Sequence, residues 1–528
     1  MDKKEEQRIE KLGAFEVNEQ LLALAQKDEK NSFFLNAGKG NPNWINTQAR
    51  LAFCQLVEFG VLESQRTLMH GDMAGSIETE GIYDRFLTFL NTKGEEQVMF
   101  FRSGLHYLDQ NLELSMNDVV AELVNGAIGN NYPTPNRVLS NSETILAHYL
   151  EEILFNNQPL SRETQVFPTE GGTAAMVYIF HSLKENQLIH PGDKIAISSP
   201  IFTPYLQIPE LNDYEMVEID LSATEANHWE VSLTELDKLK DPDIKAFFIV
   251  NPSNPGSKAL GEKERKKMKE VVADHPDLMI ITDDVYGSFV EDFQSIYATV
   301  PHNTLLVYSY SKLFGATGWR LGMIALNEET IFDQLIQRLP KVWKPAVEKR
   351  YASVVLEPKK MKFIDRLVAD SRSIGLYHTS GLSTPQQVME VLFSLTHLIC
   401  IKEKDTYIDE SKKLISQRYD LLHDTLNYPK DSSHLNAKYY SLIDIYELAE
   451  HLYGNSFKDY LKDQFEEIDF LLNLAEKNGV VLMDGVGFGT KPGEVRVSSA
   501  NLPTKSYKVI GEQILELLER YHQEYIKI

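Results

Sequence analysis

The sequence predicts an α/β protein with a mostly parallel central sheet in a large domain, a smaller α/β domain and an N-terminal helical arm. Between residues 120 and 330, short apolar runs alternate with amphipathic helical segments, which is typical of a parallel sheet with covered faces. Beyond residue 400 the chain becomes more helical and acidic. The first thirty residues alternate charged side chains with Leu and Ala at helical spacing, which predicts the arm.

Individual elements follow from this pattern. Buried strands are predicted for the apolar runs 194–198, 245–250, 278–282, 304–308 and 321–326. Helices are predicted at 261–275, 461–479 and 510–528, with a further strand at 494–498. The expected organisation is an arm and active-site loop (1–50), a part of the small domain or a family-specific extension (51–119), a large domain (120–380) and a C-terminal small domain (381–528). Periodicity assigns no role to 85–120 or 330–375.

Composition excludes several classes of partner. The chain has 53 basic and 77 acidic residues, a net charge of −24, which repels nucleic acid and anionic membranes. Its 2 cysteines, Cys54 and Cys400, cannot build a disulfide framework and lack metal-ligand spacing, so no metal site is expected. The N-terminal residues lack the apolar core of a secretory signal, and no apolar run approaches the roughly 20 residues of a membrane span. We therefore expect a cytoplasmic protein.

The segment from Ser309 to Arg320, SYSKLFGATGWR, follows a predicted strand and carries the most chemical information. Lys312 can form an imine with an aldehyde cofactor, because a desolvated lysine near other cations is partly neutral. Arg320 offers a planar fork for phosphate oxygens, and the Ser309 and Ser311 hydroxyls can donate to the same group. The alternative for such a short motif taken alone is a surface lysine in a polar loop.

Three further segments favour a cofactor site. Gly171, Gly172 and Thr173 open a helix, whose free N–H groups can bind an anion, although such a start is often only a tight turn. Asp283 ends a buried strand, as a partner for a pyridinium nitrogen would, or else caps the next helix. Asn254 lies in an Asn-Pro-Gly turn that follows another strand.

These motifs occur in one order along the chain: GGT, PIFTPY, NPSNPG, DDVY, SYSKLFGATGWR and RVSSAN. That succession resembles the fold-type I aminotransferases, which use pyridoxal 5'-phosphate, across residues 120 to 500. The chain departs from the family in one motif, because the usual Asn-Pro-Thr-Gly is here Asn-Pro-Gly-Ser. The resemblance implies that Lys312 is the Schiff-base lysine and the catalytic base, and that Arg496 binds the substrate α-carboxylate.

The resemblance also implies the residues that bind the cofactor. Asp283 would contact the pyridinium nitrogen, Asn254 and Tyr286 the ring hydroxyl, and Phe202 the ring face. Tyr132 would reach the phosphate of a neighbouring subunit, which makes a homodimer the minimum active unit. The phosphate itself would be bound by the following residues of the same chain: Gly171, Gly172, Thr173, Ser309, Ser311 and Arg320.

Over its whole length the chain resembles a narrower group, the bacterial aspartate 4-decarboxylases, which convert L-aspartate to L-alanine and CO2 and have aspartate aminotransferase side activity. The great length, the arm and the loop LNAGKGNPNW carry this resemblance. It implies substrate contacts from Lys39 and Gly40, and assembly into a higher homo-oligomer of dimers. Arg372 is a candidate for the distal carboxylate, contributed across a subunit boundary, or else a solvated arginine at a helix end.

Two alternatives remain. A dedicated aspartate aminotransferase shares the early steps, requires a keto acid and releases little CO2. A non-catalytic regulator on the same fold is more distant, because such proteins carry a separate DNA-binding head and this chain is strongly acidic. The retained Lys312, Asp283, Arg320 and Arg496 also disfavour a regulator.

Overall fold

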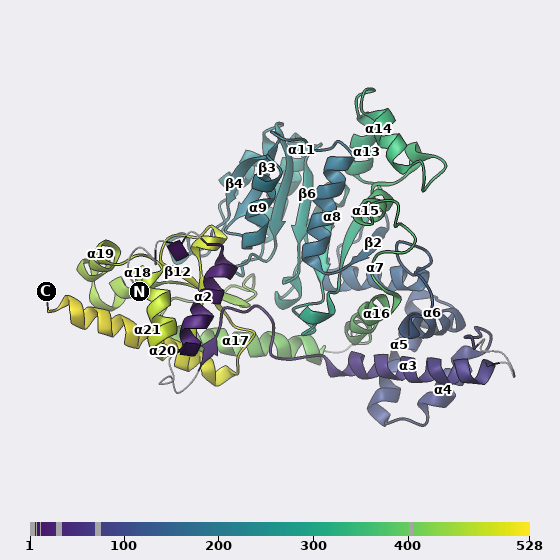
Figure 1. The fold of residues 1–528 in the computed structure, drawn as a ribbon, viewed down its shortest axis with the longest axis horizontal. Helices are drawn as coiled ribbons and strands as arrows, with labels where there is room; N and C mark the ends of the chain where they lie inside the picture. The colour runs from purple at the N-terminus through teal and green to yellow at the C-terminus, as the bar shows by residue number, and fades with distance from the viewer. Residues whose placement is uncertain are drawn as a thin grey trace.

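The computed structural model describes residues 6, 8–10, 12–27, 34–68, 75–400 and 405–527, with the side chains of 96 and 97 excepted. A large sheet with its helices occupies one part of the molecule, and the C-terminal elements form a second part beside it (Figure 1). The predicted α/β class with a mostly parallel sheet is confirmed.

The large sheet has 7 strands in the order β2-β8-β7-β6-β5-β3-β4. All neighbouring pairs are parallel except those of β8, which is antiparallel to both β2 and β7. The five predicted strands correspond to β3, β5, β6, β7 and β8, and the two edge strands escaped prediction. The strands are β2 (Thr164–Thr169), β3 (Lys194–Ser199), β4 (Glu215–Asp220), β5 (Ile244–Val250), β6 (Met279–Asp283), β7 (Thr304–Ser309) and β8 (Gly322–Asn327).

Helices connect and cover these strands (Figure 1). α8 begins immediately after β2 and packs on β7 and β8, which brings its N-terminus to the carboxyl end of the sheet. The predicted helix at 261–275 is α11. The connecting helices are α7 (Ser140–Leu154), α8 (Gly172–Glu185), α9 (Thr203–Leu211), α10 (Leu233–Asp237), α11 (Glu262–Asp274), α12 (Ile296–Thr299), α13 (Ile331–Arg338), α14 (Lys344–Tyr351) and α15 (Phe363–Ser371).

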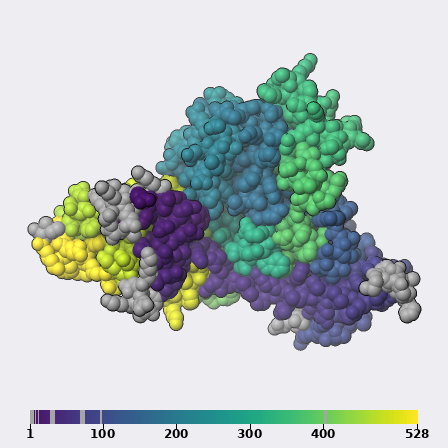
Figure 2. Space-filling view, in the orientation of Figure 1, coloured from purple at the N-terminus to yellow at the C-terminus, as the bar shows by residue number. Residues whose placement is uncertain are grey.

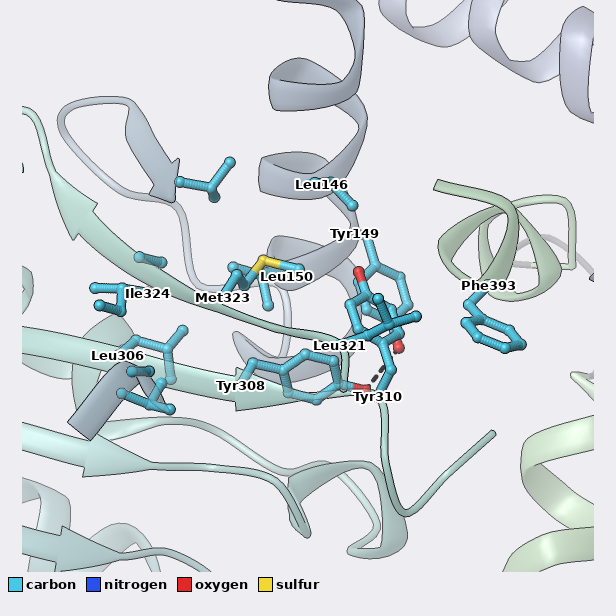
Figure 3. Packing of buried hydrophobic residues seen from close by; sticks show 14 of the residues in the cluster. Leu146, Tyr149, Leu150, Leu306, Tyr308, Tyr310, Leu321, Met323, Ile324 and Phe393 are labelled. Carbon is cyan, nitrogen blue, oxygen red and sulfur yellow. Dashed lines mark hydrogen bonds between the residues drawn. The ribbon is translucent and has the colours of Figure 1, made fainter. Parts of the chain in front are cut away.

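A cluster of aromatic side chains anchors the chain where it leaves β7 (Figure 3). The hydroxyls of Tyr149 from α7 and Tyr308 from β7 lie 2.8 Å apart. The Tyr310 ring is stacked against Tyr149 and against Phe393, with centroids 5.7 and 6.1 Å apart. Because all four side chains are buried, the backbone two residues before Lys312 has little freedom to move.

The region before β2 is helical, and part of it shares the core of the large sheet. α3, α5, α6 and α16 contribute buried residues to the same apolar cluster as β7 and β8. α16 lies beyond the expected domain boundary at 380 and packs here against α3, α6 and α7. These helices are α3 (Thr47–Thr67), α4 (Ile82–Leu90), α5 (Glu95–Leu112), α6 (Met116–Ile128) and α16 (Thr384–Leu398).

The C-terminal part contains a 3-stranded antiparallel sheet in the order β11-β12-β9. The predicted strand at 494–498 is β12. The single helix predicted at 461–479 is instead two helices, because α19 ends at Gln464 and α20 begins at Asp469. The elements are α17 (Thr406–Leu426), β9 (Tyr440–Asp444), α18 (Ile445–Tyr453), α19 (Asn455–Gln464), α20 (Asp469–Asn478), β11 (Met483–Asp484), β12 (Glu494–Ser498) and α21 (Thr504–Tyr525).

The N-terminal arm packs on this C-terminal part. α2 (Ala14–Lys27) contacts α20, β10 (Val480–Val481) and β11, and β1 (Leu35–Asn36) pairs in parallel with β10. In the space-filling view the purple arm lies between the C-terminal elements and the large sheet (Figure 2). Residues 1–5, 7, 11 and 28–33 of the predicted arm lie outside the described residues.

The described ranges lack both a membrane-spanning helix and a cluster of metal-ligating side chains. No helix within them is both long enough and apolar enough to cross a membrane. The same ranges contain no group of three or more His, Cys, Asp or Glu side chains that could hold a metal ion.

Candidate active site

A cavity of about 500 Å³ lies where strands β5, β6 and β7 end, between the large sheet, the arm and the C-terminal part. This edge of a parallel sheet is the usual place for a ligand in an open α/β fold. The residues that line the cavity are Phe15, Asn18, Glu19, Leu22, Gly38, Lys39, Gly40, Asn41, Gly172, Thr173, Phe202, Tyr205, Val250, Asn254, Asp283, Val285, Tyr286, Ser309, Ser311, Lys312, Thr317, Arg320, Tyr440, Met483 and Arg496.

Lys312 is held between the segment after β7 and the loop that follows β1. Its Nζ donates a hydrogen bond of 3.0 Å to the carbonyl of Gly40. Trp44 Nε1 donates to the Leu313 carbonyl at 3.0 Å, which ties the two segments together. Gly315 has φ +57°, and a side chain there would collide with the Trp44 carbonyl. Only glycine therefore allows the loop to approach this closely.

Asp283 forms the floor of the cavity at the end of β6, and only 5% of the residue is exposed. Tyr205 donates a hydrogen bond of 2.9 Å to Asp283 Oδ2, and the backbone N–H of Val285 donates to Oδ1 at 3.2 Å. Burial raises the pKa of the Asp283 carboxyl to about 6, although these hydrogen bonds and the nearby Lys312 act in the opposite direction. A cationic ligand here would stabilise the ionised carboxylate.

Asp283→Asn is expected to stabilise the protein without cofactor by about 3 kcal/mol above pH 6, because one pKa unit corresponds to about 1.4 kcal/mol. The folded pKa of about 6 exceeds the ordinary 3.8, so folding is penalised once the carboxyl ionises. The gain is full above pH 6 and shrinks as the pH falls towards 3.8. Urea unfolding of both cofactor-free proteins at pH 8 and pH 5.5 measures it. A variant less stable than the parent at pH 8 would contradict this reading.

An anion-binding cradle lies at the N-terminus of α8. Gly172 and Thr173 begin the helix and line the cavity with free N–H groups. Gly171 has φ +89°, and a Cβ there would lie 2.6 Å from an Arg320 guanidinium nitrogen. Ser309 Oγ lies 3.0 Å from Ser311 Oγ, so the two hydroxyls face the same space. An arginine fork, two hydroxyls and a helix N-terminus together suit a phosphate group.

Arg496 from β12 is a buried cation with 2% of the residue exposed. Its guanidinium donates to Asn254 Oδ1 at 3.0 Å and to the Gly38 carbonyl at 2.6 Å, whereas its Nε has no hydrogen-bond partner among the described residues. Its ring neighbours are Tyr440 and Phe488, whose centroids lie 4.3 and 4.5 Å away. Burial lowers the pKa of Arg496, and a bound carboxylate would offset that cost.

The three cationic side chains of the cavity motifs all donate hydrogen bonds to backbone carbonyl groups. Lys312 donates to the Gly40 carbonyl, Arg496 to the Gly38 carbonyl, and Arg320 to the carbonyls of Thr317 and Glu170. None of the three forms an ion pair with a carboxylate in the part of the chain that the structure describes. The cavity therefore holds positive charge that neutral carbonyl oxygens only partly satisfy, which favours an anionic ligand.

A chain of hydrogen bonds connects the side chains beside Lys312. Asn254 Nδ2 donates to the Tyr286 hydroxyl at 3.4 Å, and that hydroxyl lies 3.0 Å from the Tyr440 hydroxyl. Asn254 also accepts from Arg496 through its Oδ1. These contacts set the positions of the Asn254, Tyr286 and Tyr440 side chains beside Lys312.

The structure brings most of the predicted site residues together. Gly171 lies close to the Arg320 guanidinium. Tyr132 is 68% exposed and does not line the cavity of a single chain, so its predicted role across a subunit boundary stays a prediction. Arg372 is buried outside the cavity lining, where it donates to the Tyr377 carbonyl at 2.9 Å. The predicted residues that do line the cavity are Lys39, Gly40, Gly172, Thr173, Phe202, Asn254, Asp283, Tyr286, Ser309, Ser311, Lys312, Arg320 and Arg496.

The lining residues that sequence reasoning missed include two tyrosines and four side chains of the arm. Tyr205 lies within the PIFTPY motif, but only Phe202 of that motif was predicted to be a site residue. Tyr440 opens β9, a strand that was not predicted. The arm contributes four side chains to the lining, and nothing in its local pattern indicates that it reaches the cavity. They are Phe15, Asn18, Glu19 and Leu22.

These residues fit pyridoxal phosphate, the cofactor that the resemblance implies. Burial destabilises the ionised form of the Asp283 carboxyl, and a protonated pyridine nitrogen would stabilise that form. The cradle at α8 matches the phosphate, and Lys312 provides the amine that binds the aldehyde. Asn254 and Tyr286 offer an amide and a hydroxyl to the ring oxygen. No part of this donor set conflicts with the cofactor.

Comparisons with known proteins also indicate a pyridoxal-phosphate enzyme. The family model described as aminotransferase class I and II matches residues 104–514. A Pseudomonas sp. protein called bifunctional aspartate aminotransferase and L-aspartate beta-decarboxylase is 41% identical over 526 residues, covering 99% of this chain and 98% of its own. A Thermus thermophilus aspartate aminotransferase double mutant superposes with a TM-score of 0.61 at 16% identity, covering 97% of this chain and 98% of its own. An aromatic aminotransferase from Pyrococcus horikoshii superposes with a TM-score of 0.58 at 17% identity, covering 94% of this chain and 99% of its own.

The fold, the cavity and the match across most of the chain lead to one conclusion. The family model covers well over half of the sequence, and the Pseudomonas relative is similar from end to end. The chain belongs to the class I and II aminotransferase family of pyridoxal-phosphate enzymes.

Proposed function

We propose that this protein decarboxylates L-aspartate at its β-carboxylate, giving L-alanine and CO2, and transfers the amino group of aspartate as a side activity. The observation that carries the proposal is the 41% identity, over 99% of the chain, to a protein named for both activities. This match also includes residues before 104, which the aminotransferase family model does not cover.

The cofactor is pyridoxal phosphate, which when bound supplies an electron sink for bonds at the substrate carbon next to the amino group. In this proposal Asp283 keeps the ring nitrogen protonated, since its carboxylate lies buried at the cavity floor. Lys312, released by the incoming amino acid, takes the proton from the α-carbon as a general base. Arg496 binds the α-carboxylate with its two-pronged donor geometry.

The fate of the distal carboxylate decides between the two activities. Once Lys312, Arg320 and Arg496 are assigned to cofactor and α-carboxylate, Lys39 is the cation that remains in the described lining. Lys39 is exposed and Glu19 lines the same cavity, so the distal carboxylate meets one solvated cation and one anion. Weak binding stabilises the ground state of the distal carboxylate less than a tight arginine pair would. It thereby favours loss of CO2.

A second candidate is a dedicated aspartate aminotransferase. Its support comes from the fold, which the Thermus thermophilus enzyme shares over 97% of this chain. The cavity would serve this reaction equally well up to the point where CO2 is lost.

The test is to incubate the purified protein with pyridoxal phosphate and L-aspartate, without a keto acid, and to measure CO2 and alanine over many turnovers. Equal and sustained formation of both is expected. Amino transfer that appears only after a keto acid is added, with no CO2, would assign the protein to the aminotransferases. D-aspartate, which cannot present its α-hydrogen to Lys312 in the same binding mode, is the control substrate.

We also propose that the enzyme works in the cytoplasm as a homodimer or a higher homo-oligomer of dimers. The exposed Tyr132, which the resemblance assigns to a neighbouring subunit's phosphate, supports a dimer. The content of 2 cysteines supports a reducing compartment.

A further inference from the structure

Tyr440 occupies a position that no motif identified. It is the first residue of β9, it lines the cavity, and it is 2% exposed. Its backbone N–H donates to Ser257 Oγ at 2.8 Å, which fixes it to the turn that follows Asn254. Its register partner in the antiparallel sheet is Ser498, two residues beyond Arg496. The fold therefore holds this tyrosine rigidly against the reacting groups.

The Tyr440 side chain lies among three polar side chains that line the cavity, those of Tyr286, Lys312 and Arg496. Its hydroxyl is 3.0 Å from the Tyr286 hydroxyl and within hydrogen-bonding reach of Lys312. A side chain on Gly40 would collide with this hydroxyl and come 3.1 Å from Lys312 Nζ, so both groups border the same small space. The Arg496 guanidinium lies 4.3 Å from the centre of the Tyr440 ring.

Electrostatics distinguishes Tyr440 from its neighbours. Burial raises the pKa of the Tyr440 phenol, but the Lys312 and Arg496 charges together with hydrogen bonds from Tyr286 and Lys312 outweigh burial, so the pKa lies below its ordinary value. The pKa values of Tyr286 and Tyr439 are instead raised well above the ordinary value, chiefly by burial. Among these three phenols, Tyr440 is the one whose environment stabilises the anion left after it donates a proton.

The proposed reaction requires such an acid. When the bond between the β-carbon and the distal carboxylate breaks, CO2 leaves, and the bound cofactor would supply the sink for the electron pair. The pair then returns to form a carbon–hydrogen bond at the β-carbon, which takes up one proton from a donor. Lys312 serves the proton of the α-carbon, so a second group that donates to the β-carbon allows both carbons to be protonated without interference.

We propose that the Tyr440 hydroxyl is the acid that protonates the β-carbon of aspartate after CO2 leaves, an assignment that rests on the decarboxylase function proposed above. A substrate held at Lys312 and Arg496 spans the two groups that flank Tyr440, which directs its β-carbon to the hydroxyl. The resulting phenolate lies against two cations and regains its proton from solvent through Lys312. Amino transfer involves no protonation at the β-carbon and does not use this hydroxyl.

The experiment compares Tyr440→Phe with the parent enzyme, both loaded with pyridoxal phosphate. Phenylalanine keeps the ring beside Arg496 and removes only the hydroxyl. Alanine formation from L-aspartate is expected to fall about 100-fold or more, the usual contribution of a general acid. Oxaloacetate formation in the presence of 2-oxoglutarate is expected to stay within about threefold, so the ratio of the two rates changes.

Tyr439→Phe is the matched control. Tyr439 is the adjacent residue, and its hydroxyl donates to the Gly40 carbonyl at 2.9 Å without lining the cavity. The ratio of decarboxylation to amino transfer should be unchanged in this variant, whatever its total rate. A parallel fall of both activities in Tyr440→Phe, or an unchanged rate of alanine formation, would overturn the proposal. A parent enzyme that releases no CO2 would overturn the decarboxylase function as well, which separates the two failures.

Discussion

Lys312→Ala reduces the turnover of L-aspartate by roughly 10⁴-fold or more, because the residue supplies both the cofactor linkage and the base for the α-proton. The structure gives this lysine no substitute, since the other lysine of the described cavity lining, Lys39, is exposed on the loop after β1. The variant also loses the visible absorbance of the lysine-bound cofactor. Turnover and absorbance should disappear together, which spectra and a coupled alanine assay measure on one sample.

Lys266→Ala serves as the control, because Lys266 is exposed on α11, away from the cavity lining. It should keep full turnover and the full cofactor spectrum. Borohydride reduction followed by peptide mapping provides an independent check, since the reduced cofactor should label the peptide that contains Lys312. A label on another lysine, or visible absorbance that persists in Lys312→Ala, would remove the assignment.

Arg496→Ala is expected to weaken the binding of every α-amino acid by about 100-fold, because it removes the buried partner of the α-carboxylate. The same change should cost the cofactor-free protein little stability. Arg496 is buried among Tyr440, Phe488 and Asn254 without an ion-pair partner in the described structure, so its removal abolishes a desolvation cost. Titration with aspartate and with alanine measures the binding, and urea unfolding measures the stability.

Two comparisons sharpen this result. Arg496→Lys keeps the charge but loses the fork, so its binding should recover only in part. Arg372→Ala tests the prediction that Arg372 binds the distal carboxylate. A loss confined to dicarboxylic substrates would support that role across a subunit boundary, whereas equal effects on alanine and aspartate would exclude it. Unchanged α-carboxylate binding in Arg496→Ala would refute the assignment of that arginine.

The sequence was sufficient to predict the five inner strands of the central sheet and many of the residues that line the cavity beside it. Continuous apolar runs such as 245–250 identify strands that are buried on both faces, and β5 agrees with that run to within one residue. The edge strand β4 is mostly exposed, with Val217 half-buried and Ile219 buried, which gives a much weaker signal. The break between α19 and α20 was missed because the apolar spacing continues through Phe465 and Ile468.

The missed site residues depend on tertiary contacts. Tyr440 and Tyr439 are adjacent and chemically identical, and only the register of β9 against β12 decides that Tyr440 lines the cavity. The arm reaches the cavity because α2 packs on α20 and β11, more than 400 residues later in the chain. No local pattern encodes either contact. The charged motif residues could be found because their chemistry is recognisable without knowledge of their surroundings.

The backbone carbonyls that accept hydrogen bonds from Lys312, Arg320 and Arg496 imply that ligand binding is an exchange. Each incoming carboxylate or phosphate oxygen displaces a neutral oxygen from a cation, so affinity measures the difference between two sets of bonds. The loop that carries Gly38 and Gly40 is then a competitor of the substrate as well as part of its binding site. For the same reason we expect small inorganic anions to compete with the substrate for these cations, with a strength that follows their charge and shape.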